Sequence, residues 1–147
     1  MITIVTGPTH CGKSTYIAEH KNPMECCADI FDFQEGYDTL KDLTTAQYNF
    51  LRAIEDYCRE SKQNMWIEGC FSNPYRIGQI INTIRAAGRE DEIRVIYILR
   101  DEEWYLNHLD IVEGLYAAQQ IKYYKFYNDG GAAVYKLINK EVLEEVK

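Results

Sequence analysis

The stretch ITIVTGPTHCGKS, residues 2–14, constrains the fold of this chain more than any other part of it. Residues suited to a buried strand run directly into the pattern G-x-x-x-x-G-K-[ST], which Gly7, Gly12, Lys13 and Ser14 satisfy. A run capable of forming a helix, residues 14–21, follows at once. The order of strand, glycine-containing loop and helix is the context in which this pattern predicts a loop that binds phosphate groups.

The predicted chemistry of this loop follows from its backbone. Gly7 and Gly12 can take conformations closed to other residues, so the N–H groups between them can surround an anion. The positive end of the following helix faces the same anion. Lys13 adds a full charge for the outer phosphates, and the Ser14 hydroxyl can coordinate magnesium. We therefore predict that ATP and Mg²⁺ bind here, through Gly7, Pro8, Thr9, His10, Cys11, Gly12, Lys13, Ser14 and Thr15. A simple glycine turn is the alternative.

The bulk composition is that of one ordinary globular domain, residues 1–147. No apolar run approaches the length of about 20 residues that spans a membrane, and the first residues do not resemble a basic, cleavable signal. We therefore expect a cytoplasmic protein. The five cysteines show no C-x-x-C pair and no His spacing suited to zinc, which favours reduced, buried thiols over a disulfide framework or a zinc site. Cys11 lies inside the predicted loop. It is a candidate for modification by oxidants or alkylators; the alternative is that it only packs within the loop.

The net charge of −7 argues against broad attraction to a long nucleic acid. A small molecule or a nucleic-acid end is the expected acceptor, although one local basic groove would overcome this argument. The sequence does not specify an oligomeric state.

Strand and helix patterns alternate along the chain. We expect strands over residues 2–6, 26–31, 64–69, 93–99 and 133–138. Helices are expected over 44–63 and 74–88, over much of 101–128, and in a short segment that Asn139 caps. The apolar positions of the two central helices are Tyr48, Leu51, Ile54, Tyr57 and Cys58 in one and Ile77, Ile80, Ile81 and Ile84 in the other. This alternation predicts a three-layer α/β sandwich around a central, mainly parallel, five-stranded sheet.

Two carboxylates are expected at the sheet edge that carries the loop. Asp32 closes the second predicted strand and Glu68 ends the third. Phosphoryl transfer needs one carboxylate for magnesium or its waters and one to orient the attacking hydroxyl. We assign Glu68 to the metal and Asp32 to the acceptor. The alternative for each is a solvated turn residue or a helix cap.

These features together resemble the P-loop kinases, and within them the polynucleotide 5′-hydroxyl kinases and zeta-toxin-like kinases. The loop, Asp32, Glu68 and the run SNPYR at 72–76 carry the resemblance, which covers about the first 110 residues. It implies a P-loop NTPase fold of the kinase type and transfer of phosphate from ATP with magnesium. It also implies that Asp32 acts on the acceptor hydroxyl and that Arg76 lies near the acceptor.

The segment 101–129 matches the helical lid of such kinases in position but departs from it in composition. The family brings lid arginines against the transferring phosphate. This segment contains no arginine and offers only His108, Lys122 and Lys125, while Arg100 directly precedes it. We take Arg100 as the candidate catalytic arginine. The alternatives are a lysine in its place, weak NTPase activity, or a regulatory module that binds nucleotide without transferring phosphate.

Aromatic residues are frequent in the same segment. They could stack on a base, but Tyr116, Tyr123 and Tyr127 fall near one helical face, and packing against the sheet is the favoured interpretation. The leading hypothesis is an ATP-dependent kinase that acts on a nucleoside, nucleotide, polynucleotide end or similar small acceptor.

Overall fold

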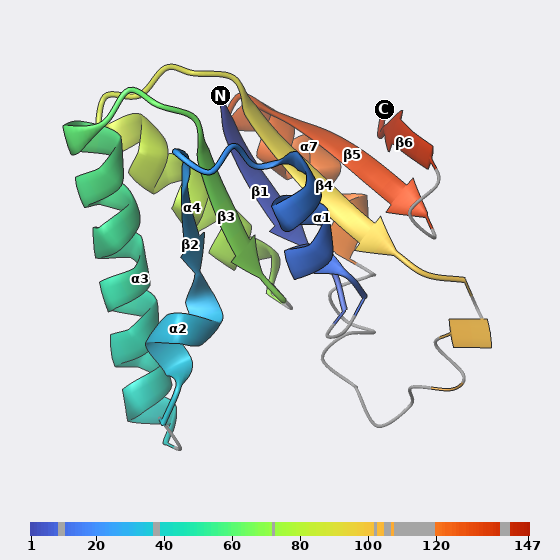
Figure 1. Ribbon diagram of the computed structural model, residues 1–147, viewed down its shortest axis with the longest axis horizontal. Coiled ribbons are helices and arrows are strands. Elements are labelled where there is room, and N and C mark those ends of the chain that lie inside the picture. The colour runs from blue at the N-terminus through green and yellow to red at the C-terminus, as the bar shows by residue number, and fades with distance from the viewer. Residues whose placement is uncertain are drawn as a thin grey trace.

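The core of the molecule is a six-stranded sheet with the strand order β2-β3-β1-β4-β5-β6 (Figure 1). The structure is a computed structural model that describes residues 1–8, 11–36, 39–71, 73–101, 103–104, 107, 120–138 and 142–147. The strands are β1 Ile2–Thr6, β2 Cys26–Asp29, β3 Met65–Gly69, β4 Ile93–Leu99, β5 Ala132–Ile138 and β6 Val142–Glu145. The first five are parallel, and β6 is antiparallel to β5.

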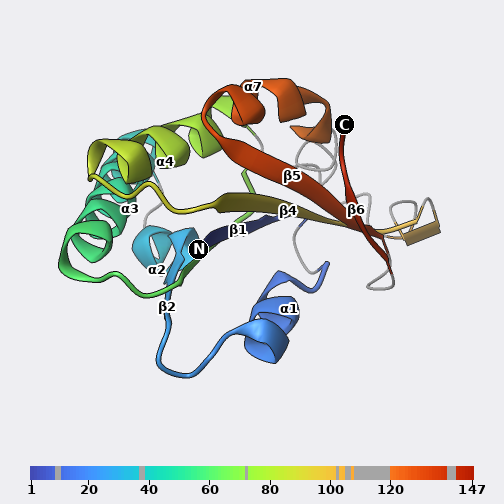
Figure 2. The same cartoon turned by 90° about the horizontal axis from the view of Figure 1, so that it is seen from above.

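Helices cover both faces of the sheet. They are α1 Lys13–His20, α2 Ile30–Gln34, α3 Leu40–Glu60, α4 Pro74–Ala86, the 3-10 helix η1 Gln120–Tyr123 and α7 Tyr124–Asp129. Figure 2 shows α3, α4 and α7 on one face and α1 on the other. Parallel strands require such crossover connections. The predicted three-layer α/β sandwich is therefore confirmed, with one strand more than expected.

Successive side chains of each strand point to opposite faces of the sheet, so each strand contributes to two cores. Ile4 of β1 and Val95 of β4 belong to the core beneath α3 and α4, whereas Val5 and Ile96 belong to the smaller core beneath α1. Every residue of β1 is buried, including Thr3 and Thr6, as expected for a central strand covered on both faces. No helix among the described residues is long and apolar enough to cross a membrane.

Two elements differ from the prediction near the second strand. β2 ends at Asp29, where the Asp29 carboxylate accepts a hydrogen bond from the Phe31 N–H and caps α2. The long helix α3 begins after Thr39, whose hydroxyl accepts from the Asp42 N–H, rather than after residue 44 or 45. Its buried apolar residues follow i, i+4 spacing and leave Tyr48 and Tyr57 exposed; they are Ala46, Phe50, Ile54 and Cys58.

The prediction for α4 is confirmed in detail. Asn73 caps it by accepting from the Tyr75 N–H, and Pro74 is its first residue. The four predicted isoleucines are all buried.

The last predicted helix is wrong, because residues 142–145 form β6, which pairs Leu143 with Leu137 and Val142 with Ile138. Asn139, its expected cap, lies outside the described residues. Of the predicted lid, η1 and α7 are helical as expected, while His108 and Tyr116 also lie outside the described residues.

Candidate nucleotide-binding site

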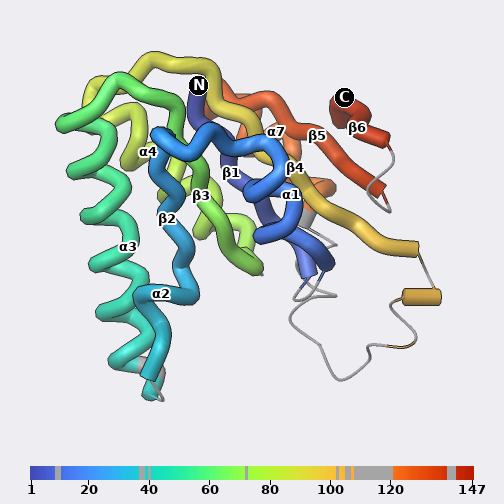
Figure 3. Tube along the Cα trace, in the orientation of Figure 1, coloured from blue at the N-terminus to red at the C-terminus, as the bar shows by residue number. Residues whose placement is uncertain are grey.

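The glycine-containing loop lies at the carboxyl end of β1, at the point where the sheet topology reverses. Figure 3 traces the chain from β1 through α1 to β2, which lies beyond β3, whereas β4 lies on the other side of β1. Ligands of open parallel sheets bind at such a point. Thr9 and His10 of the predicted loop lie outside the described residues.

Both motif glycines have backbone conformations that other residues rarely adopt. Gly7 has φ +149°, and a Cβ atom there would lie 2.4 Å from the carbonyl oxygen of Ile98 and 2.9 Å from the Cys11 sulfur. Gly12, the cap residue of α1, has φ +108°. Glycine at these positions lets the loop turn against the end of β4 and enter α1 without steric conflict.

Lys13 extends back across the loop. Its Nζ donates to the carbonyl oxygens of Gly7, at 3.1 Å, and Pro8, at 2.9 Å. The ammonium group therefore lies beside the loop at the start of α1, where the positive end of the helix dipole also acts. The two positive contributions suit an anion at this position.

Ser14 and Glu68 join the start of α1 to β3. The Ser14 hydroxyl donates to Glu68 Oε1 at 2.5 Å, and Glu68 is only 7% exposed. Burial raises the pKa of the Glu68 carboxyl, and the negative charge of Asp29 raises it further, whereas the Ser14 hydrogen bond lowers it. Asp29 of β2 lies directly opposite Glu68 in the strand register. Two carboxylates and a hydroxyl thus meet at the carboxyl edge of the sheet.

These oxygen ligands suit magnesium. Mg²⁺ is held by one or two carboxylates together with substrate phosphates and waters, rather than by a complete protein cage. The described part of the chain contains no group of three or more His, Cys, Asp or Glu residues that could hold a metal ion by itself. Ser14 and Glu68 therefore fit a cation that phosphate helps to bind, with Asp29 next to them on β2.

Asp32 does not lie where the sequence predicted. It lies within α2 and is exposed, so the carboxylate at the end of the second strand is Asp29. Ile30 and Phe31 are residue types common in strands, so the predicted strand was extended past Asp29, where β2 ends. The signal for Asp29 was its preference as a helix N-cap.

The two candidate arginines lie at the same edge. Arg76 is half-buried in the first turn of α4, and Arg100 directly follows β4, with its guanidinium 5.5 Å from the centre of the Trp104 ring. Their contact with a ligand stays a prediction.

None of the five cysteines forms a disulfide; Cys11 and Cys58 are buried as predicted, whereas Cys26, Cys27 and Cys70 are only partly buried. Cys11 is fully buried beneath the loop, and burial raises the pKa of its thiol. The pKa of Cys27 is raised to about 12 by burial and by the charges of Glu68 and Asp29. Both thiols therefore stay protonated at neutral pH and are weak nucleophiles.

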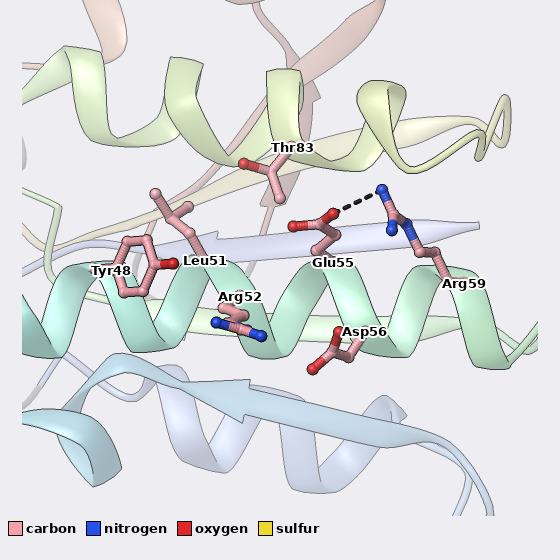
Figure 4. Close-up of a pocket in the computed structure, with 7 residues that line it drawn as sticks. All are labelled: Tyr48, Leu51, Arg52, Glu55, Asp56, Arg59 and Thr83. Carbon is pink, nitrogen blue, oxygen red and sulfur yellow. Dashed lines mark ion pairs between the residues drawn. The ribbon is translucent and has the colours of Figure 1, made fainter.

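A second hollow lies between α3 and α4, away from the loop (Figure 4). Its charged side chains include the pair Arg59 and Glu55, whose nitrogen and oxygen atoms are 2.6 Å apart. The lining residues are Tyr48, Leu51, Arg52, Glu55, Asp56, Arg59 and Thr83. None of the predicted site residues belongs to it.

Comparison with known proteins finds similar solved structures but no similar sequence family. No protein-family model matches the chain, and no curated protein sequence matches it significantly. Among solved structures, it is similar to a chain from the PezAT chromosomal toxin–antitoxin system of the human pathogen Streptococcus pneumoniae, with a TM-score of 0.57 and 14% identity over 97% of this chain and 69% of that one. It is also similar to the tunicamycin resistance protein of Deinococcus radiodurans, with a TM-score of 0.56 and 11% identity over 92% and 84% of the two chains. At these identities the similarities show a shared fold.

Proposed function

We propose that this protein is an ATP-dependent kinase that transfers the γ-phosphate to a hydroxyl group of a small acceptor. The observation that carries the proposal is the hydrogen bond from Ser14 to the buried Glu68, made at the first turn of α1 and beside Lys13. A buried carboxylate is costly without a partner charge, so Glu68 beside the glycine-containing loop suits a bound magnesium ion.

The residues divide the work of phosphoryl transfer. The loop amides and Lys13 bind the phosphates, and Ser14 and Glu68 hold magnesium, which neutralises charge on the phosphates when bound. Asp29 takes the acceptor-side role predicted for Asp32, because it ends β2 next to Glu68. Arg100 and Arg76 supply positive charge toward the transferring phosphate and the acceptor.

A nucleotide-binding regulatory module, or a weak NTPase, is the second candidate. It is favoured by the lack of arginine in 101–129, since lid arginines contribute several orders of magnitude to the rate of related enzymes.

Transfer from γ-labelled ATP to a panel of nucleosides, nucleotides, oligonucleotide ends and simple alcohols tests the proposal. We expect labelled product with at least one acceptor class, dependent on magnesium, and loss of ATP binding in Lys13→Ala. The variant Lys41→Ala, at the exposed start of α3, is the matched control and should bind ATP normally. ATP binding without transfer to any acceptor would instead support the regulatory module.

The acceptor-side carboxylate is tested by two matched variants. Asp29→Asn should reduce transfer by at least about 100-fold, the usual scale of a general base, while ATP affinity stays nearly unchanged. Asp32→Asn, three residues further on and exposed, should remain close to the unchanged protein. If Asp32→Asn loses transfer and Asp29→Asn does not, Asp32 is the acceptor-side carboxylate.

A further inference from the structure

An aromatic ring lies against the arginine that directly precedes segment 101–129. Arg100 follows β4 and is half-buried, and the central carbon of its guanidinium lies 5.5 Å from the centre of the Trp104 ring. The Trp104 N–H donates to Asp101 Oδ1 at 2.9 Å, which fixes the backbone of this turn. A cation at this distance from an indole ring is attracted by its electron-rich face. We call this contact the Arg100–Trp104 pair.

This pair follows the part of β4 that touches the glycine-containing loop. The strand register places Thr6 of β1 beside Tyr97 of β4. One residue further on, Gly7 packs so closely that a Cβ atom on it would lie 2.4 Å from the Ile98 carbonyl oxygen. Arg100 is two residues beyond Ile98 in the chain. The loop and the pair therefore leave neighbouring strands at the same end.

The alternation of side chains directs Arg100 to the face of the sheet that carries the loop. Ile98 belongs to the core beneath α1, together with Cys11 of the loop. Residues two positions apart in an extended chain point to the same face. Arg100 therefore leaves β4 on the side of Cys11 and α1, where the candidate phosphate site lies.

Stacking suits an arginine that also binds phosphate. Contact with a ring engages the flat face of a guanidinium, whereas its N–H groups lie in the plane and can donate to phosphate oxygens. A side chain already held by a ring loses less conformational freedom on binding than a solvated one. The contact therefore places a positive charge next to segment 101–129, which contains no arginine of its own.

We propose that Trp104 is a positioning residue, which holds the Arg100 guanidinium at the outermost phosphate of the bound nucleotide. This inference rests on nucleotide binding in the proposed function and adds a residue that the sequence did not indicate. Its consequence is selectivity between nucleotides. Arg100 contacts the γ-phosphate, so ATP binds more tightly than ADP, and Trp104 sets the size of that difference.

Nucleotide affinity provides the test without an acceptor or turnover. Calorimetry in the presence of Mg²⁺ compares a non-hydrolysable ATP analogue with ADP. We expect the unchanged protein to prefer the analogue, and Trp104→Leu to reduce that preference by about 5-fold or more, the scale of one cation–π contact, with ADP affinity unchanged. Trp104→Phe, which keeps an aromatic face, should retain most of the preference. Arg100→Ala should abolish it, and adding Trp104→Leu to Arg100→Ala should cause no further loss.

Tyr123→Leu is the matched control. The Lys122 ammonium lies 5.5 Å from the centre of the Tyr123 ring, the same distance as in the Arg100–Trp104 pair, and Tyr123 is 40% exposed. Loss of this ring should leave both affinities unchanged. If Tyr123→Leu lowers the preference and Trp104→Leu does not, a lysine has the role and the inference is overturned.

Tryptophan emission gives a second readout that a purely structural role of Trp104 would not change. The chain contains two tryptophans, so Trp66→Phe leaves Trp104 as the reporter. We expect the ATP analogue to change the emission more than ADP does, and Arg100→Ala to remove that difference.

The inference is overturned if Trp104→Leu lowers the affinities for the ATP analogue and for ADP equally, or lowers neither. An equal emission change with both nucleotides would also contradict it. The proposed function fails separately, through lack of labelled transfer to every acceptor in a protein that still prefers the ATP analogue. A protein that binds neither nucleotide would contradict both.

Discussion

Glu68 is the residue at which stability and the proposed function oppose each other. Its carboxyl is buried at the end of β3, and its pKa is raised above the ordinary value chiefly by that burial. A raised pKa means that folding favours the protonated form. Glu68 therefore contributes its full stability below the ordinary carboxyl pKa, and that contribution is lost as pH rises through the folded value.

The variant Glu68→Gln tests this opposition. Gln keeps an acceptor for the Ser14 hydroxyl and removes the buried charge, so the free protein should gain about 1 kcal/mol at pH 7, the scale of one buried polar group. The gain should shrink as pH falls towards the ordinary glutamate pKa. The increase in melting temperature caused by Mg²⁺ and ATP should disappear. Thermal unfolding at several pH values, with and without ligand, measures all three effects.

Glu55→Gln is the control for this variant, since Glu55 is a partly exposed member of an ion pair on α3. Exposed pairs contribute little, so its stability and its response to ligand should stay nearly unchanged. A Glu68→Gln protein that is less stable at pH 7, yet still responds to Mg²⁺ and ATP, would show that Glu68 is structural.

At the scale of elements, α4 and α7 are matched through one small residue. Gly78 lies in the interior of α4, where glycine costs about 1 kcal/mol relative to alanine. The three atoms nearest to a Cβ placed there all belong to the Phe126 ring, the closest at 2.6 Å. The helix thus accepts a poor helix former to make room for α7.

A double-mutant cycle tests this packing. Gly78→Ala alone should destabilise the protein, because the new methyl group displaces the Phe126 ring. In a Phe126→Ala background the same substitution should stabilise it by about 1 kcal/mol, because only the helix propensity remains. Urea unfolding of the four proteins gives the sign of each effect. Destabilisation of equal size in both backgrounds would contradict the packing.

The same elements indicate how far sequence reasoning reached. It predicted α4 in full, because the Asn73 cap, Pro74 and the spacing of four isoleucines all agree. It misjudged the buried face of α3, since Tyr48 and Tyr57 have apolar rings that the structure leaves exposed. Residues 142–145 were expected in a helix, but pairing with β5 decides their conformation. Whether a short segment forms a strand depends on the neighbouring strand as well as on its own residues, so local preference did not predict β6.

At the scale of the whole molecule, the amino and carboxyl ends of the parallel strands have different roles, one in stability and one in the candidate site. The amino edge is closed by Arg89, which is 2% exposed. It donates to both carboxylate oxygens of Asp91, at 2.7 Å each, and to the carbonyl oxygens of Ser61, at 2.8 Å, and Gln63, at 2.9 Å. This network ties the connection after α3 to the connection after α4. The carboxyl edge carries the candidate site.

Asp91→Asn tests the amino edge. Arg89 holds the pKa of the Asp91 carboxyl well below its ordinary value of 3.8, so the pair stabilises the fold above that pH, and the contribution is lost as pH falls through the folded value. We expect a loss of about 2 kcal/mol at pH 7, typical of hydrogen bonds to charged groups. The difference from the unchanged protein should narrow below about pH 4.

Urea unfolding across this pH range provides the measurement, and ATP binding provides the control. ATP affinity at pH 7 should be unchanged because the network lies at the opposite edge from the loop. A stability difference that stays constant with pH would show that the charge of Asp91 contributes nothing.

The sequence by itself determined the loop and the general architecture. A glycine-rich loop between a strand and a helix, and the alternation of periods typical of strands and helices, are local properties that need no distant contact. Only the tertiary structure decided that Asp29, rather than Asp32, lies opposite Glu68, and that Tyr75 meets Phe126. These pairs join segments far apart in the chain. Their formation depends on strand register and helix packing, which are set by the burial of the whole core rather than by any short stretch of sequence.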